Sequence, residues 1–434
     1  MTIDLSTITF TNQADIVPVS GQDAIVNTDI ANTLAGNDTI TGIGAPFNFF
    51  NPSGSPFGII NSGTLNTAEG NDIITGTGGS GGIINSGPFN TGKGNDIITG
   101  TGDYFEGIYN SGTFNTAEGN DIITGNGVRV GIYNSGTFNT ANGNDVITGT
   151  GGKSSGIFIA DGSTFDTGDG HDSISGEGRT GIYNGSITFN TGDGNDTIEG
   201  TGYSTGIYNT GLINTGNGKD TIIANATYGY GLFNSSTIDT GDGEDIITGS
   251  GGIKNDGTID TGDGDDIITG SPAFSYWGND ITGLDNKGTI DTGNGNDSII
   301  ANGLFIGIDG TINTGDGMDI ITSNKGIEND GTINTGNGAD FIIANGDFKG
   351  MGSVFLENGK DHLNGFGTGN FNGGNNQDTL ELPSGSYTVG ISGTTMSFTK
   401  SGVIMYTSEF EKLIAGSTTY DFTSLTEGQT IVVA

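Results

Sequence analysis

Residues 191–199 read TGDGNDTIE, and near-copies of this nonapeptide return along the chain, among them TGDGEDIIT at 240–248 and TGNGADFII at 335–343. Self-similarity at a steady interval indicates a repeat architecture in which each copy builds one structural unit. The shared element is Gly-x-Asp, and most successive copies are 21 to 27 residues apart. Each interval is therefore expected to form one coil of a stacked fold, with about fifteen coils in all.

Large apolar residues follow a second rule inside each repeat, as Ile247, Ile253, Ile259 and Ile268 illustrate. Small polar and β-branched residues alternate around them and glycine marks the ends, which is typical of short strands and not of helices. One such coil cannot bury a core, whereas stacked coils enclose a continuous column of Ile, Leu and Phe. The sequence predicts an all-β fold, a parallel β-solenoid with three sides.

The repeat divides the chain into three predicted regions. It covers residues 33–380, which form the solenoid. Residues 1–32 alternate like strands and are expected to cap one end or to pair with a neighbouring molecule. From about residue 381 the repeat gives way to hairpin-like alternation with lysines, which predicts a small β-rich C-terminal cap over 381–434.

The composition narrows the possible partners. The 434 residues include 50 acidic side chains, 12 basic ones and no cysteine, for a net charge of −38. Such a surface repels nucleic acid and anionic lipid, and no apolar stretch approaches the roughly 18 residues of a transmembrane helix. The first residues, MTIDLSTITFTNQADIVPVS, lack a basic start and an apolar block. We expect no nucleic-acid binding, no membrane insertion and no N-terminal export signal.

No catalytic constellation stands out in the sequence. The only histidines, His171 and His362, lie inside turn motifs, and there is no Ser-His-Asp set, metal–histidine cluster or isolated carboxylate pair. The sequence therefore predicts that the protein is not an enzyme. A polysaccharide-active groove along the solenoid is the alternative.

One aspartate closes each Gly-x-Asp turn, so stacking the coils places these carboxylates in a row. At strand spacing they would lie about 5 Å apart, where like charges repel unless a cation lies between them. Carboxylate and carbonyl oxygens are the ligands that Ca2+ prefers. The candidate ligands are Asp38, Asp72, Asp96, Asp121, Asp145, Asp172, Asp196, Asp220, Asp245, Asp266, Asp297, Asp319, Asp340, Asp361 and Asp378. The alternative is an aspartate that only accepts hydrogen bonds from turn amides.

The nonapeptide at 191–199 resembles the Gly-Gly-x-Gly-x-Asp repeat of RTX calcium-binding exoproteins, with threonine in place of the first glycine. The resemblance covers most of residues 33–380 and implies several Ca2+ ions bound between successive turns. Since the motif occupies one corner of each coil, we expect a single file of ions. Ala68, Ala117 and Ala141 replace the second glycine, where a left-handed backbone is costly for alanine, so these coils are expected to be the first to lack calcium.

The C-terminal region resembles those of cyanobacterial RTX surface proteins, which end in a Phe-Glu-Lys-Leu element and a hydroxyl-rich apolar tail. Here that element is residues 410–413. The resemblance implies contact with a type I exporter during secretion, a location outside the cell or at its surface, and folding that is driven by external calcium.

Two further columns of polar residues follow from the repeat. Asparagines after one apolar position are expected to stack into a hydrogen-bonded ladder: Asn85, Asn110, Asn134, Asn184, Asn209, Asn234, Asn255, Asn286 and Asn329. The threonines that open the turns are expected to pack and cap, with a flat ice-binding array as the alternative: Thr167, Thr191, Thr215, Thr240, Thr261, Thr292, Thr314 and Thr335.

Together these patterns favour a secreted, calcium-binding structural protein that forms or decorates an extracellular fibril, sheath or S-layer-like coat. Its expected partners, besides calcium, are further copies of itself or a cell-surface polysaccharide. The alternative is a monomeric adhesin or carbohydrate-binding protein that uses two aromatic insertions, one from Phe47 to Phe57 and one containing Phe274, Tyr276 and Trp277. An ice-binding solenoid is a weaker alternative.

Overall fold

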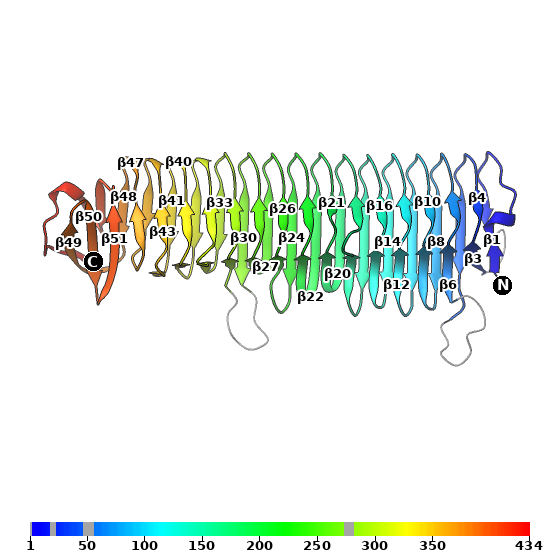
Figure 1. Cartoon of the computed structure of the whole chain (residues 1–434), viewed down its shortest axis with the longest axis horizontal. Helices are drawn as coiled ribbons and strands as arrows, with labels where there is room; N and C mark the ends of the chain where they lie inside the picture. The colour runs from blue at the N-terminus through cyan, green and yellow to red at the C-terminus, as the bar shows by residue number, and fades with distance from the viewer. Residues whose placement is uncertain (1, 18–22, 47–55, 273–281) are drawn as a thin grey trace. The chain divides into compact units, whose positions relative to one another are not determined.

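The computed structural model describes residues 2–17, 23–46, 56–272 and 282–434. They belong to two compact units, Met1–Leu232 and Phe233–Ala434. Both units consist of short strands (Figure 1), and two 3₁₀ turns, η1 (Leu5–Thr7) and η2 (Phe422–Ser424), are the only helical segments in the described ranges. Successive coils pair in parallel, so the predicted parallel β-solenoid is confirmed.

In the first unit each coil contributes strands to three faces. The first face contains β2 (Ile16–Val17), β5 (Thr39–Ile43), β8 (Ile73–Gly78), β11 (Ile97–Gly102), β14 (Ile122–Gly127), β17 (Val146–Gly151), β20 (Ser173–Asn184), β22 (Thr197–Asn209) and β24 (Thr221–Ala226). The second contains β1 (Thr2–Asp4), β3 (Ala24–Asn27), β6 (Phe57–Asn61), β9 (Gly81–Asn85), β12 (Glu106–Asn110), β15 (Val130–Asn134), β18 (Ser155–Ile159) and the ends of β20 and β22. The third contains β4 (Ile30–Asn32), β7 (Thr64–Asn66), β10 (Pro88–Asn90), β13 (Thr113–Asn115), β16 (Thr137–Asn139), β19 (Thr164–Asp166), β21 (Thr188–Asn190) and β23 (Leu212–Asn214).

The second unit repeats this plan with shorter strands. Its first face contains β27 (Ile246–Gly251), β30 (Ile267–Pro272), β33 (Ser298–Ala301), β37 (Ile320–Ser323), β41 (Phe341–Ala344), β45 (His362–Asn364) and β48 (Thr379–Leu382). Its second contains β28 (Ile253–Asn255), β31 (Leu284–Asn286), β34 (Leu304–Ile306), β38 (Ile327–Asn329) and β42 (Phe348–Lys349). Its third contains β26 (Thr237–Asp239), β29 (Thr258–Asp260), β32 (Thr289–Asp291), β35 (Thr311–Asn313), β39 (Thr332–Asn334), β43 (Ser353–Phe355) and β46 (Asn370–Asn372). Strand β25 (Leu232–Asn234) lies at the boundary between the two units.

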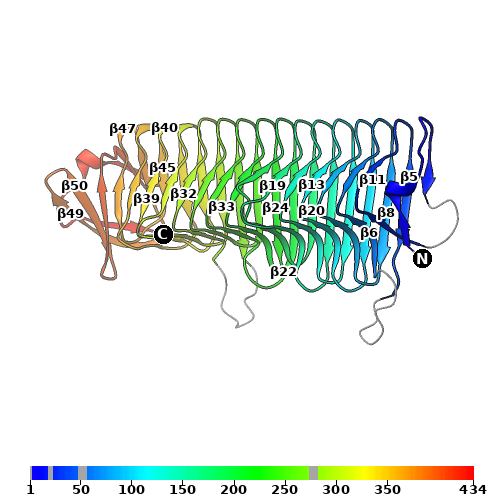
Figure 2. The ribbon, with the colours of Figure 1, turned by 45° about the vertical axis from the view of Figure 1, so that its right-hand side comes forward.

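The Gly-x-Asp turns connect the third face of one coil to the first face of the next. Four of them carry two-residue strands, β36 (Asp316–Gly317), β40 (Asn337–Gly338), β44 (Asn358–Gly359) and β47 (Asn375–Asn376). These four pair in parallel, Asp316 with Asn337 and Asn337 with Asn358. The turn backbone is therefore held in register from coil to coil (Figure 2).

Each coil buries one large apolar side chain from each face. In one coil Ile74, Ile83 and Phe89 all have 0% of their surface exposed. Phe89 stacks on Phe114 and Phe114 on Phe138, with ring centroids 4.8 Å apart in both pairs. Burying a side chain of this size contributes about 1.5–3 kcal/mol, so the stacked column, and not any single coil, stabilises the fold.

The parallel pairing begins earlier than the predicted boundary at residue 33. Strand β1 pairs with β3, and β4 pairs with β7, all in parallel register. Leu5, in η1, is fully buried. The described strands before residue 33 thus form part of the coil stack itself, because their alternating pattern matches that of the following coils.

The pairing changes after β48. Strand β49 (Gly385–Ser392) pairs in antiparallel fashion with β50 (Thr395–Lys400) and β54 (Thr430–Val433), and β50 pairs likewise with β51 (Val403–Ser408). Strand β52 (Lys412–Ala415) adds in parallel to β48 and in antiparallel fashion to β53 (Thr418–Asp421). These hairpins cover the backbone edge of the last coil, which would otherwise be open to pairing.

Candidate metal site: the aspartate row

The Gly-x-Gly part of each turn needs glycine for two different reasons. Gly192 has a φ of 79°, in the left-handed region that favours glycine. A Cβ on Gly194 would lie 1.4 Å from the carbonyl oxygen of Gly170 in the preceding coil, so no side chain fits there. Repetition of both constraints explains why the turn keeps a constant length.

The alanines at the first of these positions adopt the same left-handed backbone. Ala68, Ala117 and Ala141 have φ values of 63°, 60° and 60°. Two of these turns are stabilised locally, because the side chains of Asn66 and Asn139 accept hydrogen bonds from the backbone amides of Ala68 and Ala141 at 3.3 and 2.8 Å. The alanine coils therefore keep the turn geometry, and their lower expected calcium occupancy stays a prediction.

Every predicted aspartate of the row points into the corner of the coil and is at most 2% exposed. One carboxylate oxygen, Oδ1, accepts a hydrogen bond from the backbone N–H of the aspartate in the preceding coil. In the first unit these contacts measure 2.7 to 2.8 Å and join Asp38 to Asp72, Asp72 to Asp96, Asp96 to Asp121, Asp121 to Asp145, Asp145 to Asp172, Asp172 to Asp196 and Asp196 to Asp220.

The second unit contains the same ladder. There the contacts measure 2.8 to 3.0 Å and join Asp245 to Asp266, Asp266 to Asp297, Asp297 to Asp319, Asp319 to Asp340, Asp340 to Asp361 and Asp361 to Asp378. The alternative in which each aspartate accepts a hydrogen bond from a turn amide is thus observed. It occupies only one oxygen of each carboxylate.

The other oxygen, Oδ2, is the unusual feature of the row. Within the described residues it is buried without a hydrogen-bond partner in Asp72, Asp96, Asp121, Asp145, Asp172, Asp196, Asp319, Asp340, Asp361 and Asp378. In Asp38, Asp266 and Asp297 it accepts a hydrogen bond from the threonine that opens the same turn. In the other coils the same threonine still lies close enough to lower the pKa of the aspartate, as Thr116 does for Asp121, but the contact falls outside normal hydrogen-bond geometry. Buried polar atoms in native proteins are normally well paired, so this oxygen is a candidate ligand for a cation in the corner.

Burial also makes these carboxylates hard to ionise in the absence of a cation. It raises the pKa of Asp121 to about 7, despite the hydrogen bonds that favour the charged form. The pKa of Asp72 rises to about 7 and that of Asp145 to about 6 for the same reason. A row of ionised aspartates near neutral pH therefore requires compensating positive charge.

The donor set fits a calcium ion held largely by backbone oxygen. Among the described residues no three His, Cys, Asp or Glu side chains converge on a common point. Ca2+ accepts six to eight oxygens, and the unpaired Oδ2 atoms together with turn carbonyls belong to that class.

A second ladder on the outside of the turns was not foreseen. At many turns the residue before the aspartate is an exposed Asn, Asp or His, and its side chain accepts the backbone N–H of its counterpart in the next coil, as from Asn95 to Asn71 at 2.8 Å. His171 takes part through Nδ1, which accepts the amide of Asn195 at 2.7 Å. The frequent asparagine immediately before the turn aspartate is the sequence signal from which this outer ladder could have been predicted.

The asparagine ladder is confirmed in segments, with breaks at Ile159 and Ile306, and it extends further towards the N-terminus than expected. Asn85, Asn110 and Asn134 join side chain to side chain at 2.8 Å, and each is fully buried. Asn27 and Asn61 continue the ladder towards the N-terminus.

The turn-opening threonines are at most 1% exposed, so they pack as expected and cannot present an ice-binding array. The variable aspartates, such as Asp169 and Asp193, face solvent.

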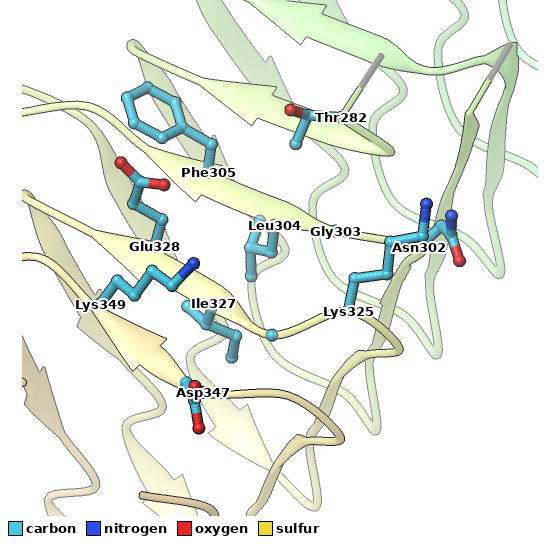
Figure 3. Close-up of a pocket in the computed structure, with 11 residues that line it drawn as sticks. Thr282, Asn302, Gly303, Leu304, Phe305, Lys325, Ile327, Glu328, Asp347 and Lys349 are labelled. Carbon is cyan, nitrogen blue, oxygen red and sulfur yellow. The ribbon is translucent and has the colours of Figure 1, made fainter. Parts of the chain in front are cut away.

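The second unit also has a surface pocket of about 240 Å3 between β34, β38 and β42. Figure 3 shows Phe305, Lys325, Glu328, Asp347 and Lys349 around it. All four charged side chains are exposed.

The predicted aromatic insertions lie largely outside the described residues, including Phe274, Tyr276 and Trp277. In the part of the chain that the structure describes, no helix has the length and apolarity to cross a membrane.

Comparison with known proteins gives a distant likeness to a solved structure. No protein-family model matches the chain, and no curated protein matches it. A solved structure that does match is the X-ray crystal structure of a hyperactive, Ca2+-dependent, β-helical antifreeze protein from an Antarctic bacterium. It is 15% identical, the match covers 86% of this chain and 78% of that chain, and the TM-score is 0.27. A likeness of this degree establishes neither a family nor a ligand for this chain.

Proposed function

We propose that the aspartate row binds a file of Ca2+ ions and that the protein is a calcium-stabilised structural component of an extracellular coat or fibril. The observation that carries the proposal is the buried Oδ2 atom left without a protein partner in coil after coil. A divalent cation would pair these oxygens and remove the repulsion between neighbouring carboxylates.

In this proposal the ions lie along the corner formed by the Gly-x-Asp turns. Asp72, Asp96, Asp121, Asp145, Asp172 and Asp196 would each supply Oδ2 in the first unit. Because one or two carboxylates cannot fill the coordination shell of Ca2+, backbone carbonyls and water would complete it. The ions act on stability and stiffness, and the proposal assigns no catalytic step to the chain.

The extracellular location follows from the same chemistry. A chain with a net charge of −38 and a buried acidic row is disfavoured in the folded state when calcium is scarce. Millimolar external calcium binds only the folded state and so stabilises it by mass action. Folding after export is then the favoured order of events.

Burial of the 410–413 element supports this order. Phe410 is 5% exposed and Leu413 is fully buried in the folded chain. A type I exporter that reads this element can therefore contact it only before the C-terminal hairpins form. We infer that calcium-dependent folding outside the cell and recognition of an unfolded C-terminus inside it are parts of one export route.

Calcium titration of the full chain tests the proposal. The protein is stripped with chelator and returned to Ca2+ or, as a control at equal ionic strength, to Mg2+, while circular dichroism and thermal unfolding are recorded. We expect a gain of β signal and of melting temperature with Ca2+ and a much smaller effect with Mg2+, which prefers a rigid octahedral shell. An unfolding curve that is identical with chelator and with Ca2+ would refute calcium binding.

Electron microscopy of the calcium-loaded protein tests the structural role separately. Ordered filaments or sheets are expected if the chain builds a coat by self-association. Dispersed single particles that bind polysaccharide would instead favour the adhesin.

A further inference from the structure

Five coils of the first unit present a regular array of side chains on the outer side of the first face. The array belongs to β5, β8, β11, β14 and β17, whose strands pair in unbroken parallel register. Its three columns are Thr39, Ile73, Ile97, Ile122 and Val146; Thr41, Thr75, Thr99, Thr124 and Thr148; and Ile43, Thr77, Thr101, Asn126 and Thr150. We call these fifteen residues the threonine array.

The threonine array is uncharged in a protein that carries a net charge of −38. All fifteen positions hold Thr, Ile, Val or Asn. The array ends where carboxylates enter the same columns, at Glu177 and Glu199 in β20 and β22. A neutral area of this regularity on so acidic a chain suits a neutral partner.

The array is also accessible, and its hydroxyl groups have no protein partners. Ile73, Ile97 and Ile122 are 42%, 39% and 43% exposed. Within the described residues, none of the threonine hydroxyls of the array donates to or accepts from another protein group, whereas the turn-opening threonines are buried. These hydroxyls are thus available to an external hydrogen-bonding partner.

The glycine between the second and third columns of each strand keeps the array regular. Gly76 and Gly100 are buried and face inward, and a Cβ on Gly100 would lie 2.2 Å from the carbonyl oxygen of Gly107. Backbone therefore packs directly on backbone beneath the array, which fixes the height of each strand. Threonine is stiff at χ1, so its methyl and hydroxyl groups project from fixed positions.

We propose that the threonine array binds the surface of an ice crystal. Its groups repeat about every 4.8 Å between strands and about every 6.6 Å along them, a two-dimensional lattice on the scale of the oxygen repeats in ice. Rigid alternating methyl and hydroxyl groups can hold water in a lattice that matches the solid, at little entropic cost because the array is pre-organised. The array contains no aromatic ring on which a sugar could stack. This inference extends beyond the proposed function and does not require coat formation.

The test is thermal hysteresis and incorporation into growing ice, measured on the full calcium-loaded chain. We expect the unmodified protein to hold ice crystals below the melting point and to enter ice at planes that match the lattice. Thr99→Tyr, at the centre of the array, should lower the hysteresis severalfold because the bulky ring lifts the neighbouring rows off the ice. Thr124→Tyr, one coil away, should do the same.

Thr137→Tyr is the matched control. Thr137 is an exposed threonine of β16 on the third face, so the same substitution there should leave hysteresis unchanged. Circular dichroism establishes that each variant remains folded. The inference is overturned if the unmodified protein shows no hysteresis, or if Thr99→Tyr and Thr137→Tyr lose it equally.

Two other occupants of the array would also overturn it. Dimerisation in sedimentation velocity that Thr99→Tyr abolishes would assign the array to a second copy of the chain. Binding to crystalline cellulose or chitin that Thr99→Tyr abolishes, without hysteresis, would assign it to a polysaccharide. Failure of the ice experiment leaves the calcium titration unaffected, so the two proposals are separable.

Discussion

At the scale of single residues, the carboxylate of each turn aspartate has two oxygens with different environments. In Asp121, Oδ1 accepts the amide of Asp96 at 2.8 Å, while Oδ2 is buried without a partner. The first contact is structural and survives replacement of the carboxylate by an amide. The second is available to a cation, so the two roles can be separated by one substitution.

Asp121→Asn is predicted to change stability in opposite directions with and without calcium. Asparagine keeps the Oδ1 acceptor and removes a buried charge, so without metal near pH 8 the variant should be more stable, by about 1–3 kcal/mol. With calcium it should be less stable than the unmodified protein, because one ligand oxygen is lost. Chemical denaturation with chelator and with Ca2+ measures both values.

Asp169→Asn is the control for this substitution, because Asp169 lies in a turn of the same row, two coils away, but faces solvent. It should have little effect under either condition. An effect of Asp121→Asn with the same sign in chelator and in calcium would indicate that the aspartate only bonds turn amides.

At the scale of the structural element, side-chain ladders link each coil to the next beside the backbone pairing. Asn110 donates to Asn134 Oδ1 at 2.8 Å and to the carbonyl of Thr137 at 2.8 Å, and it accepts from Asn85. The three asparagine side chains are fully buried at a corner, where water cannot readily replace a lost partner. The ladder therefore contributes to coil stacking wherever it is continuous.

Asn110→Ala is predicted to destabilise the folded protein by about 3 kcal/mol, because it leaves buried donors and acceptors of two neighbouring coils unpaired. Asn126→Ala, on the exposed threonine array, removes an amide without a protein partner and should cost little. Thermal or chemical unfolding of both variants in calcium compares them. Equal destabilisation would show that the buried ladder contributes nothing beyond side-chain packing.

At the scale of the whole molecule, many shifted carboxyl groups act together. Burial raises the pKa of Asp72, Asp121 and Asp172 from the ordinary value of 3.8 to about 7. Without metal the folded chain then binds more protons than the unfolded chain over this interval. Stability is greatest below about pH 4 for these groups and falls as pH rises through about 7.

The predicted pH dependence is therefore a melting temperature in chelator that decreases between about pH 4 and about pH 7 and levels off above it. Saturating calcium should abolish or reverse the decrease, because the ion takes the place of the protons and binds the deprotonated row more tightly. Melting curves across this range, with chelator and with Ca2+, provide the measurement. A flat profile in chelator would contradict the buried acidic row.

Much of the fold and of the candidate site was predictable because repetition places equivalent residues on top of one another. The nonapeptide at 191–199 determined the parallel stacking, the strands of each coil and the membership of the aspartate row, since glycine and β-branched residues impose local conformations at fixed positions. The Asn ladder followed by the same rule. The alternating strands before residue 33 stack by the same rule. Their sequence differs from the nonapeptide, so the repeat alone did not place them in the solenoid.

Only the tertiary structure decided which way polar side chains point and what they contact. The sequence pattern of the aspartate row is the same whether the carboxylate oxygens face solvent, backbone amides or a cation. Burial of Oδ2 depends on how closely the neighbouring coils approach. Likewise, the turn-opening threonines and those of the threonine array are the same residue type, yet the pleat of the backbone buries the first set and exposes the second.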